Sequence, residues 1–210
     1  MPIAVALTVP PTIKRIIDAA IAEFGQKGED ATKIDDIAAR AGISKQLIYH
    51  YYGTKHALYI SVLEAICDVE HLRILTINFD EMAPLDAIVE FFSTIMDTNL
   101  TNNHFFAIDQ ILHLANDSSS RKAIGQFGKS ALRKLTDIIE RGQREGHIRD
   151  DVAASQLFLH MLLLSTGFAN FRVIMPQYIG ADFTGQTAED NWRKHAVESV
   201  LAAVKRQGDH

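Results

Sequence analysis

One six-residue run of the chain carries four polar side chains at positions i, i+1, i+4 and i+5, namely Lys45, Gln46, Tyr49 and His50. In a helix these positions share one face. A glutamine amide can bond two adjacent atoms of adenine, a lysine can reach O6 or N7 of guanine, and the neighbouring Leu47 can touch a thymine methyl group. The run therefore predicts a helix whose exposed face reads base edges in the major groove of DNA.

Side chains around this run are suited to binding the phosphate backbone. Tyr49, His50 and Tyr51 offer hydroxyl and imidazole donors, and Lys55 adds a cation at the start of the next predicted helix, where the helix dipole is positive. The complete set that we predict to contact DNA is Thr32, Lys33, Ser44, Lys45, Gln46, Leu47, Tyr49, His50, Tyr51, Thr54 and Lys55.

Two short predicted helices, over residues 33–40 and 45–51, must hold this face in place. Gly42 lies in the tight turn between them and can adopt the positive φ that such a turn needs. Thr32 is the expected N-cap of the first helix. The expected contacts between the helices are Ile37, Ala38, Ile43, Ile48 and Tyr52. This pattern is typical of a helix-turn-helix, and an ordinary helical hairpin with a polar solvent-facing side shares it.

Helical periodicity continues along the rest of the chain, and runs typical of strands are nearly absent. The first helix begins near Pro11 and ends near Gly25 and Gly28, and Thr54 is the expected cap of a long helix. The expected fold is all-α with about nine helices, the later ones over residues 55–77, 84–100, 104–115, 121–144, 151–175 and 187–206. We expect an N-terminal three-helix DNA-binding head at residues 1–54 and a ligand-binding and dimerisation domain at 55–210.

The composition fits a globular protein with a site-specific partner. The chain has 210 residues, 47% of them hydrophobic, and a net charge of −5. Residues 1–60 carry seven Lys/Arg and six Asp/Glu, a net +1, whereas residues 61–210 carry fourteen and twenty, a net −6. This contrast favours a small basic face over nonspecific coating of nucleic acid. The single cysteine, Cys67, fits a reducing compartment, and we expect a cytoplasmic protein without a signal peptide or membrane span.

These segments resemble the signature of the TetR/AcrR family of transcriptional regulators. The resemblance lies in IDDIAARAGIS at residues 34–44, in LIYHYYGTKHAL at 47–58, and in the pattern AAxxxFxxxG at 19–28. It implies a homodimer that binds palindromic operator DNA through the helix at 45–51, acts most often as a repressor, and is released by a small-molecule effector. The resemblance implies that the positions matching Lys45, Gln46 and Tyr49 face bases. It also implies that the positions matching His50, Tyr51 and Lys55 touch phosphates.

The chain departs from the family pattern at Gln46, Tyr51 and Gly53, where a small residue, a histidine and a polar residue are usual, so the operator sequence stays open. A second match, GQREGHIRDD at residues 142–151, resembles the connection before the last two helices of many members. The segments KHALYISVL at 55–63 and MAPLDAI at 82–88 resemble the pyrimidine-utilisation repressors of the family, which implies a small planar polar effector.

The last two predicted helices have the pattern expected of a dimer interface. Residues 157–171 are apolar nearly all round. The last helix has one apolar line through Trp192, Ala196 and Val200 and another through Val197, Leu201 and Val204, of which one is expected to face the subunit core and the other a second subunit. The predicted dimer contacts are Leu157, Met161, Leu164, Phe168, Trp192, Val197, Val200, Leu201 and Val204. Burial of both helices within a monomer is the alternative.

An effector pocket is expected among the helices between residues 83 and 175. Its predicted lining is Phe92, Met96, Phe105, Phe106, Gln110, His113, Met161, Phe168 and Phe171. Asp109 and His113, with His104 nearby, leave open a metal-responsive regulator of the same fold, and a helical adaptor without DNA affinity is a further alternative. The sequence lacks a phosphate-binding glycine loop, a His-Glu-x-x-His motif and a nucleophile elbow, so we expect no enzyme, cofactor or resident metal.

Overall fold

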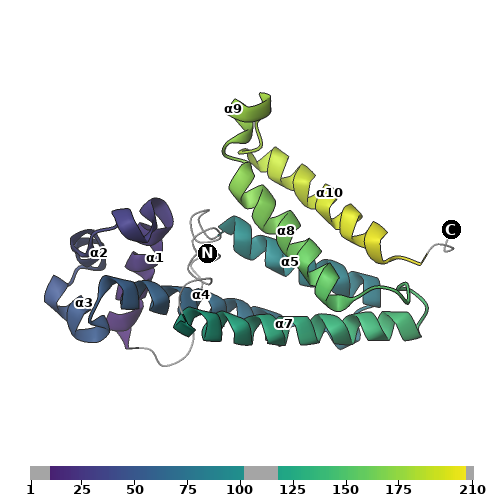
Figure 1. Ribbon diagram of the computed structural model, residues 1–210, viewed down its shortest axis with the longest axis horizontal. Coiled ribbons are helices and arrows are strands. Elements are labelled where there is room, and N and C mark those ends of the chain that lie inside the picture. Colours follow the sequence, from purple (N-terminus) through teal and green to yellow (C-terminus); the bar gives the residue numbers. More distant parts are fainter. Residues whose placement is uncertain (1–9, 102–117, 207–210) are drawn as a thin grey trace. The chain divides into compact units, whose positions relative to one another are not determined.

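The computed structural model describes residues 10–101 and 118–206, nearly all of them in helices (Figure 1). The elements are α1 Pro11–Ala31, α2 Ile34–Ala41, α3 Lys45–Tyr52, α4 Lys55–Thr76, the 3-10 helix η1 Phe79–Glu81, α5 Pro84–Thr101, α7 Ser118–Arg144, α8 Ala154–Phe171, α9 Met175–Ile179 and α10 Gln186–Val204. Within the described ranges, extended backbone pairs only at an isolated bridge between Ile148 and Lys205. The all-α prediction is confirmed, and the helix predicted over residues 104–115 lies outside the described residues.

The chain divides into two compact units. The first contains α1, α2, α3 and α4 as far as Leu72, together with the described residues 118–127. The second begins at Arg73 and contains the end of α4, α5, the rest of α7, and α8 to α10. Helix α4 therefore belongs to both units, and the functional division predicted between residues 54 and 55 falls at its start. None of the helices in the described ranges has the length and apolar character to cross a membrane.

The first unit is organised around the apolar face of α1. Ile16, Ala20 and Phe24 follow one another at i, i+4 and i+8, and each is at most 1% exposed. The ring of Phe24 meets that of Tyr59 from α4 edge to face, with centroids 5.1 Å apart. The inward residues predicted for α2 and α3 join this cluster, fully buried or packed against it: Ile37, Ala38, Ile43, Ile48 and Tyr52.

The end of α1 differs from its prediction. Gly28 has φ 72° and ψ 174°, which breaks the helix locally, and α1 continues to Ala31. The predicted N-cap role of Thr32 is wrong, because Lys33 is the N-cap of α2. The Thr32 hydroxyl donates instead to the carbonyl oxygen of Gly28 at 2.6 Å and lies 3.2 Å from that of Glu23. The Thr32 hydroxyl therefore satisfies carbonyl groups near the C-terminal end of α1, and not the free N–H groups at the start of α2.

A buried carboxylate, that of Glu23, ties α1 to α2. Its side chain is 7% exposed, and its oxygens accept from Lys27 at 2.8 Å and from Arg40 at 2.7 Å. Lys27 also bonds Asp36 at 2.9 Å, which links the two helices a second time. The hydrogen bonds from Lys27 and Arg40 lower the pKa of Glu23, although burial by itself raises it.

Helices α5, α8 and α10 pack against one another in the second unit (Figure 1). The inward line of α10 consists of Ala196, Val200 and Val204, each at most 1% exposed. Val204 was predicted on the other line, with Val197 and Leu201, and that prediction is wrong. The reason is geometric, because residues four apart lie on the same side of a helix.

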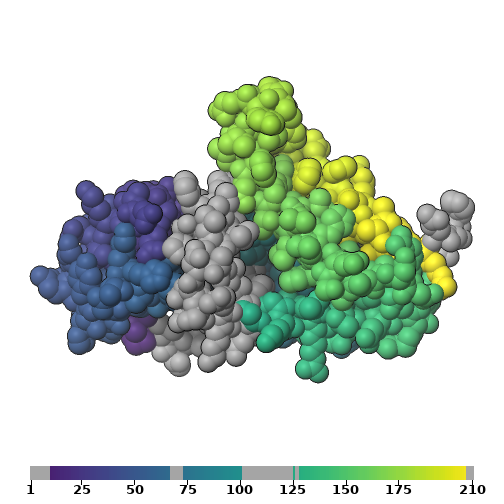
Figure 2. Space-filling model, viewed as in Figure 1, coloured from purple at the N-terminus to yellow at the C-terminus, as the bar shows by residue number. Residues whose placement is uncertain are grey.

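Helix α8 ends at Phe171, four residues before its predicted end, and the short helix α9 follows. Pro176 lies in the first turn of α9. A proline lacks the N–H that would continue the ladder of α8, so the chain begins a new helix there. Gly180 ends α9 in the left-handed conformation, with φ 72° and ψ 11°. Figure 2 shows this segment as a projection beyond the ends of α8 and α10. Neither α9 nor η1 was predicted.

Replacement of Glu23 by Gln should destabilise the protein by roughly 1–3 kcal/mol, because Lys27 and Arg40 lose a charged acceptor. The pKa of Glu23 is lowered in the folded state, so its contribution is fully present above the unfolded-state value of about 4.3 and is lost as the pH falls through the folded-state value. Urea unfolding at neutral pH and near pH 3 should therefore give a larger difference between wild type and Glu23→Gln at neutral pH. The exposed Glu198→Gln is the control, and a difference that is independent of pH would contradict this role for Glu23.

Candidate nucleic-acid interface

A glycine and an arginine fix the turn between α2 and α3. Gly42 has φ 63° and ψ 42°, which confirms the predicted left-handed conformation. A side chain there would also come within 3.1 Å of the guanidinium of Arg15. From α1, that guanidinium donates to the carbonyl oxygens of Ala41, at 3.0 Å from Nε, and of Gly42, at 2.8 Å. Arg15 thus holds the turn that precedes α3, although it lies 26 positions before Ala41 in the sequence.

Both ends of α3 are capped. Ser44 is its N-cap, and the Ser44 hydroxyl accepts from the backbone N–H of Leu47 at 3.3 Å. Gly53 ends the helix with φ 73°, a value that a residue with a side chain rarely adopts. The next helix begins at once, because the Thr54 hydroxyl accepts from the N–H of Ala57 at 3.0 Å, which confirms the predicted cap of α4. The caps fix where the two-turn helix begins and ends.

Burial of Ile48 decides which face of α3 is outward. Its side chain is 1% exposed and belongs to the core of the first unit. The polar residues lie away from that core and are all exposed, namely Lys45, Gln46, Tyr49, His50 and Tyr51, while Leu47 is half-buried. The structure thus brings the residues predicted to face bases onto one accessible helix surface, which we call the α3 face.

Lys45 has a partner on the α3 face. Its Nζ lies 2.8 Å from Oδ2 of Asp35 in α2, and this hydrogen bond raises the pKa of Lys45. The two side chains are 44% and 65% exposed, so water and salt screen their attraction. An acceptor on a nucleic acid can therefore replace Asp35. Sequence reasoning missed this role of Asp35, because the pair crosses the turn and neither residue has a local pattern that signals it.

Lys55 is placed differently from the predicted phosphate contact. Its Nζ donates to the carbonyl oxygens of Glu29 at 2.7 Å, Asp30 at 3.2 Å and Thr32 at 3.3 Å. These bonds occupy the three hydrogens of the ammonium group and tie the start of α4 to the end of α1. They also place a cation where the dipole of α1 is negative. A phosphate would have to compete with all three carbonyl groups.

The remaining residues of the predicted DNA-binding set differ in exposure. Thr32 is 2% exposed, so its side chain is withdrawn from the surface. Lys33 is exposed at the start of α2. Ser44 and Thr54 are exposed at the two ends of α3, although their hydroxyl oxygens already accept the capping hydrogen bonds.

A cavity of about 300 Å³ lies among α8, α9 and α10 in the second unit. Two of the predicted pocket residues, Phe168 and Phe171, line it. Three others are at most 1% exposed within the packed helices: Phe92, Met96 and Met161. The rest lie outside the described residues: Phe105, Phe106, Gln110 and His113.

The predicted dimer residues are mostly turned inward. Within this chain the buried ones are Leu157, Met161, Phe168, Val200 and Val204, and the half-buried ones are Leu164, Trp192, Val197 and Leu201. The large apolar side chains that are most exposed in α8 and its extension are Leu159, Leu163, Phe171, Val173, Ile174, Tyr178 and Ile179. Because α8 is apolar on every side, its sequence alone does not tell which residues face outward.

The sequence left a metal-responsive regulator open as an alternative. In the part of the chain that the structure describes, no group of three or more His, Cys, Asp or Glu side chains could hold a metal ion. The residues that left a metal-responsive regulator open, His104, Asp109 and His113, lie outside the described ranges.

Two short helices joined by a glycine turn, with an exposed polar face on the second, have the arrangement of a helix-turn-helix DNA-binding motif. The family models agree and are more specific. Residues 16–62 match the model described as "Bacterial regulatory proteins, tetR family", and residues 84–200 match "Tetracyclin repressor-like, C-terminal domain". The chain belongs to the TetR family of transcriptional regulators, which confirms the resemblance noted in the sequence.

Similar proteins with assigned roles are regulators. The HTH-type transcriptional repressor NicS of Pseudomonas putida is 26% identical over 197 residues, which cover 93% of each chain. The HTH-type transcriptional repressor SCO4008 of Streptomyces coelicolor is 30% identical over 166 residues, 79% of this chain and 80% of that one. The HTH-type transcriptional regulator RutR of Escherichia coli, the pyrimidine-utilisation regulator, is 41% identical over 78 residues, 37% of this chain and 36% of that one.

Solved structures share the fold. The transcriptional regulator FadR of Bacillus subtilis, in complex with stearoyl-CoA, has a TM-score of 0.69 at 20% identity and covers 90% of this chain and 98% of its own. A transcriptional regulator from Saccharomonospora viridis in complex with choline has a TM-score of 0.72 at 16% identity, over 93% and 98%. At these identities the similarity concerns the fold alone.

Replacement of Lys55 by Met should destabilise the first unit by roughly 1–3 kcal/mol, because three backbone acceptors lose a charged donor. Thermal unfolding measures this loss, with the exposed Lys33→Met as the matched control. A residue whose main contact is phosphate would behave differently. Its loss would leave stability unchanged and lower the slope of log affinity against log salt by roughly 0.9, and that result would contradict the positioning role.

Proposed function

We propose that this TetR-family regulator is a repressor that binds palindromic operator DNA as a homodimer and leaves it when a small-molecule effector binds. The observation that carries the proposal is the α3 face, which is polar and exposed on a helix capped at both ends and anchored by Ile48. A helix presented in this way fits the major groove, and two-fold dimers use two such helices on two half-sites. A regulator of bacterial genes acts where the DNA is, so we place it in the cytoplasm.

The proposed contacts follow from the position of each side chain. Base edges are read by Lys45, Gln46 and Tyr49, with Leu47 against thymine methyl groups. Phosphates are bound around them by Lys33, Ser44, His50, Tyr51 and Thr54. We assign Thr32 and Lys55 to positioning, because their polar atoms bond the end of α1.

Binding requires Lys45 to exchange its partner. In the free protein Asp35 holds the ammonium group at 2.8 Å, and on the operator a base or phosphate oxygen takes its place. Asp35 also brings a negative charge next to the DNA. It therefore lowers affinity for any DNA and leaves discrimination to the contacts that read base edges.

Selection of binding sites from random DNA, followed by fluorescence anisotropy, tests the proposed function. The wild type should enrich a two-fold symmetric sequence and bind it as two protomers. Gln46→Ala should lose roughly 1–3 kcal/mol of discrimination at one base pair in each half-site. Lys33→Ala, the control, should weaken binding to all sequences alike. Failure to enrich any sequence would contradict the proposal, as would an equal loss for every sequence in Gln46→Ala.

Asp35→Asn should tighten binding to all DNA by roughly three- to tenfold at low salt, because Lys45 is released and a negative charge is removed. The matched control is Asp36→Asn, which removes the same charge from α2 but leaves Lys45 paired with Asp35. Anisotropy titrations at several salt concentrations compare the two. An equal gain for both variants would show that net charge alone is responsible.

The dimer interface that we propose is an exposed apolar stripe on α8. Leu159, Leu163 and Phe171 lie at four-residue multiples along one side of α8 and are 57%, 61% and 55% exposed. Gly167 continues the stripe, and a Cβ atom there would meet no atom within 4 Å. Contiguous exposed apolar surface of this kind is costly on a monomer and marks a protein interface. Of the residues predicted from sequence, Val197, Leu201, Leu164 and Trp192 retain surface that can join this interface.

Leu163→Asp should convert the dimer to a monomer and weaken operator binding with it. A two-fold interface presents Leu163 twice, so each substitution places two charges in apolar surroundings and should raise the dimer dissociation constant by roughly a hundredfold or more. Sedimentation velocity measures the change. The control is Leu75→Asp, at an exposed leucine of α4 outside the stripe. A dimer that persists in Leu163→Asp would place the interface elsewhere.

The proposed release by an effector uses helix α4, which belongs to both units. A ligand that binds one arrangement of the second unit more tightly than another shifts the equilibrium toward that arrangement. The size of the shift is limited by the difference between the two affinities. Regulators of this fold have been solved with stearoyl-CoA and with choline, which supports a small-molecule effector here. The resemblance to pyrimidine-utilisation repressors keeps a small planar polar effector as one hypothesis.

A further inference from the structure

The first part of α7 forms a positive run in an otherwise acidic chain. Residues 118–136 contain no Asp or Glu and five Lys or Arg, namely Arg121, Lys122, Lys129, Arg133 and Lys134. The other residues of the chain carry sixteen Lys/Arg and twenty-six Asp/Glu, a net charge of −10. Even residues 37–63, which include α3, contain only three Lys or Arg. A concentration of positive charge on an acidic chain indicates a surface for an anionic partner.

Three positions of this run share one side of the helix. Lys122, Lys129 and Arg133 follow one another at i, i+7 and i+11. The side chains of Lys129 and Arg133 are exposed, and the opposite side of α7 is buried at Ala131 and Leu135. At 1.5 Å per residue, the side extends over about 17 Å from Lys122 to Arg133. We call it the α7 basic side.

The charges of the α7 basic side do not stabilise the helix. Lys129 and Arg133 are like charges at i and i+4, an arrangement that is unfavourable in a helix. The first turn of α7 contains no acidic residue, although the helix dipole favours one there. Asp137 lies four residues after Arg133, yet the structure forms no ion pair between these two side chains. The arrangement therefore needs another explanation, which an external polyanion supplies.

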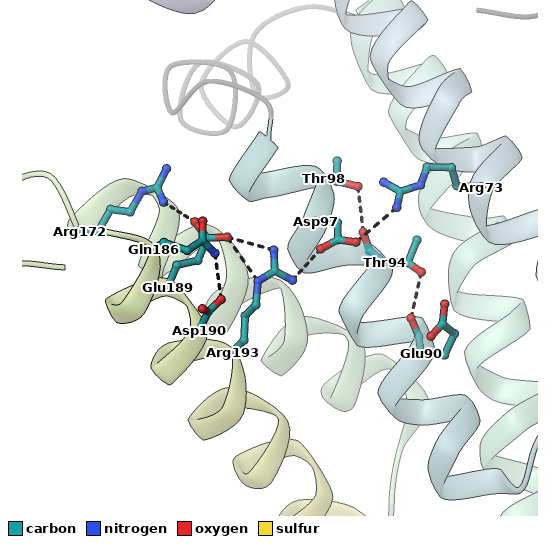
Figure 3. A network of polar contacts seen from close by, with 10 residues as sticks. All are labelled: Arg73, Glu90, Thr94, Asp97, Thr98, Arg172, Gln186, Glu189, Asp190 and Arg193. Atoms are coloured by element: carbon teal, nitrogen blue, oxygen red, sulfur yellow. Dashed lines mark hydrogen bonds and ion pairs between the residues drawn. The ribbon is translucent and has the colours of Figure 1, made fainter. Parts of the chain in front are cut away.

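The two exposed cations of this side are also without partners in the described part of the chain. No hydrogen bond or ion pair with a described residue engages Lys129 or Arg133. The contrast within the second unit is Arg193, which binds Glu189 at 3.2 Å and Asp97 at 2.6 Å (Figure 3). A cation held in this way is already neutralised, whereas Lys129 and Arg133 are available to an anion from outside.

Most Lys and Arg side chains of α1 to α4 already have partners. Lys45 bonds Asp35, and Lys55 bonds three carbonyl oxygens. The others that bond carboxylates or carbonyl oxygens are Lys14, Arg15, Lys27 and Arg40. Among the described side chains of residues 10–66, Lys33 is the one Lys or Arg without such a bond.

This shortage of free cations bears on DNA binding. Neutralised phosphates supply most of the affinity that does not depend on sequence, so α1 to α4 by themselves offer little of it. The positive run of α7 begins in the same compact unit, because residues 118–127 belong to the unit that carries the α3 face. Free cations on α7 can therefore supply what the cations of α1 to α4 do not.

We propose that the α7 basic side binds phosphates of the DNA that flanks the base pairs read by α3. Cations four residues apart on a helix lie close together, as do successive phosphates of a DNA strand. This inference rests on the proposed function in one respect, namely that α3 reads the operator. An acidic surface of a second copy is the rival occupant, since the rest of the chain is acidic. DNA is favoured, because its charge is denser and because the first unit lacks free cations of its own.

The double variant Lys129→Gln/Arg133→Gln tests this binding through its salt dependence. Glutamine keeps the helix propensity of both positions, and the variant should unfold at the wild-type temperature or above it, because the repulsion is removed. The slope of log affinity against log salt should fall by roughly 0.9 for each lost contact, so by about 3.6 for a dimer. Operator and random DNA should lose affinity by the same factor, at least about tenfold at low salt, because phosphates carry no sequence information. A slope that changes by less than about 0.5 overturns the proposal.

Arg144→Gln/Lys194→Gln is the matched control. It removes the same two charges, from exposed side chains without a partner among the described residues. Arg144 lies in the last turn of α7, beyond Asp137 and Glu140, and Lys194 lies in α10. The control should keep its slope within about 0.5 of the wild type. An equal loss in both double variants would mean that net charge alone is responsible, and it overturns the site.

Ethylation of single phosphates locates the contact on a selected operator. In the wild type, ethylation should interfere with binding around the base pairs that α3 reads and also at phosphates outside them, in two symmetric sets. Lys129→Gln/Arg133→Gln should lose the outer interference and keep the inner one. An identical pattern in the wild type and in this variant overturns a direct contact.

Sedimentation velocity without DNA separates the rival occupant. An assembly larger than a dimer that breaks down in Lys129→Gln/Arg133→Gln, with an unchanged salt slope on DNA, would identify a second copy as the partner and overturn the proposal. Random DNA separates this inference from the proposed function. A wild type that enriches no operator contradicts the proposed function, whereas the salt slope on random DNA still decides whether α7 binds phosphate.

Discussion

The α3 face depends on one constraint, that a helix of eight residues is too short to persist alone in water. Its neighbours must therefore supply its stability. Ile48 contributes the buried side chain, Ser44 and Gly53 fix the ends, and Arg15 holds the turn at Gly42 from which the helix starts. Because so few atoms of α3 are needed for packing, most of its surface is left for DNA.

Each unit holds a cation next to a carboxylate. In the first unit Asp35 holds Lys45, and in the second Glu189 holds Arg172. The two pairs differ in burial, since the Lys45 side chain is 44% exposed and that of Arg172 is 13% exposed. The exposed pair is screened and exchanges readily for phosphate or base oxygens, as DNA binding requires. The sheltered pair is screened less, so it holds α10 to the end of α8 more firmly.

Local patterns were enough to predict the helices, the Gly42 turn and the outward residues of α3, because periodicity and capping act over a few positions. Contacts between distant residues were not visible in the same way. Arg15 and Lys55 both bond backbone carbonyls 26 positions away. Lys55 was assigned to phosphate from its place at the start of a helix and from the family resemblance, and neither shows these bonds. Helix α9 has five residues, too few for a periodic signal, and α8 is apolar on every side, so its outward stripe needed the packing of α5 and α10. The effector class depends on such packing too, since one fold accommodates stearoyl-CoA and choline.

Methylation interference on a selected operator tests the central claim most directly, because dimethyl sulfate modifies guanine N7 in the major groove and adenine N3 in the minor groove. The account predicts that guanine N7 methylation blocks binding at two symmetric clusters, one for the α3 face of each protomer. It further predicts that Lys45→Ala relieves part of this pattern within the same clusters, because Lys45 reaches O6 or N7 of guanine. Interference confined to adenine N3, or a single cluster without symmetry, would contradict a dimer that reads the major groove through α3.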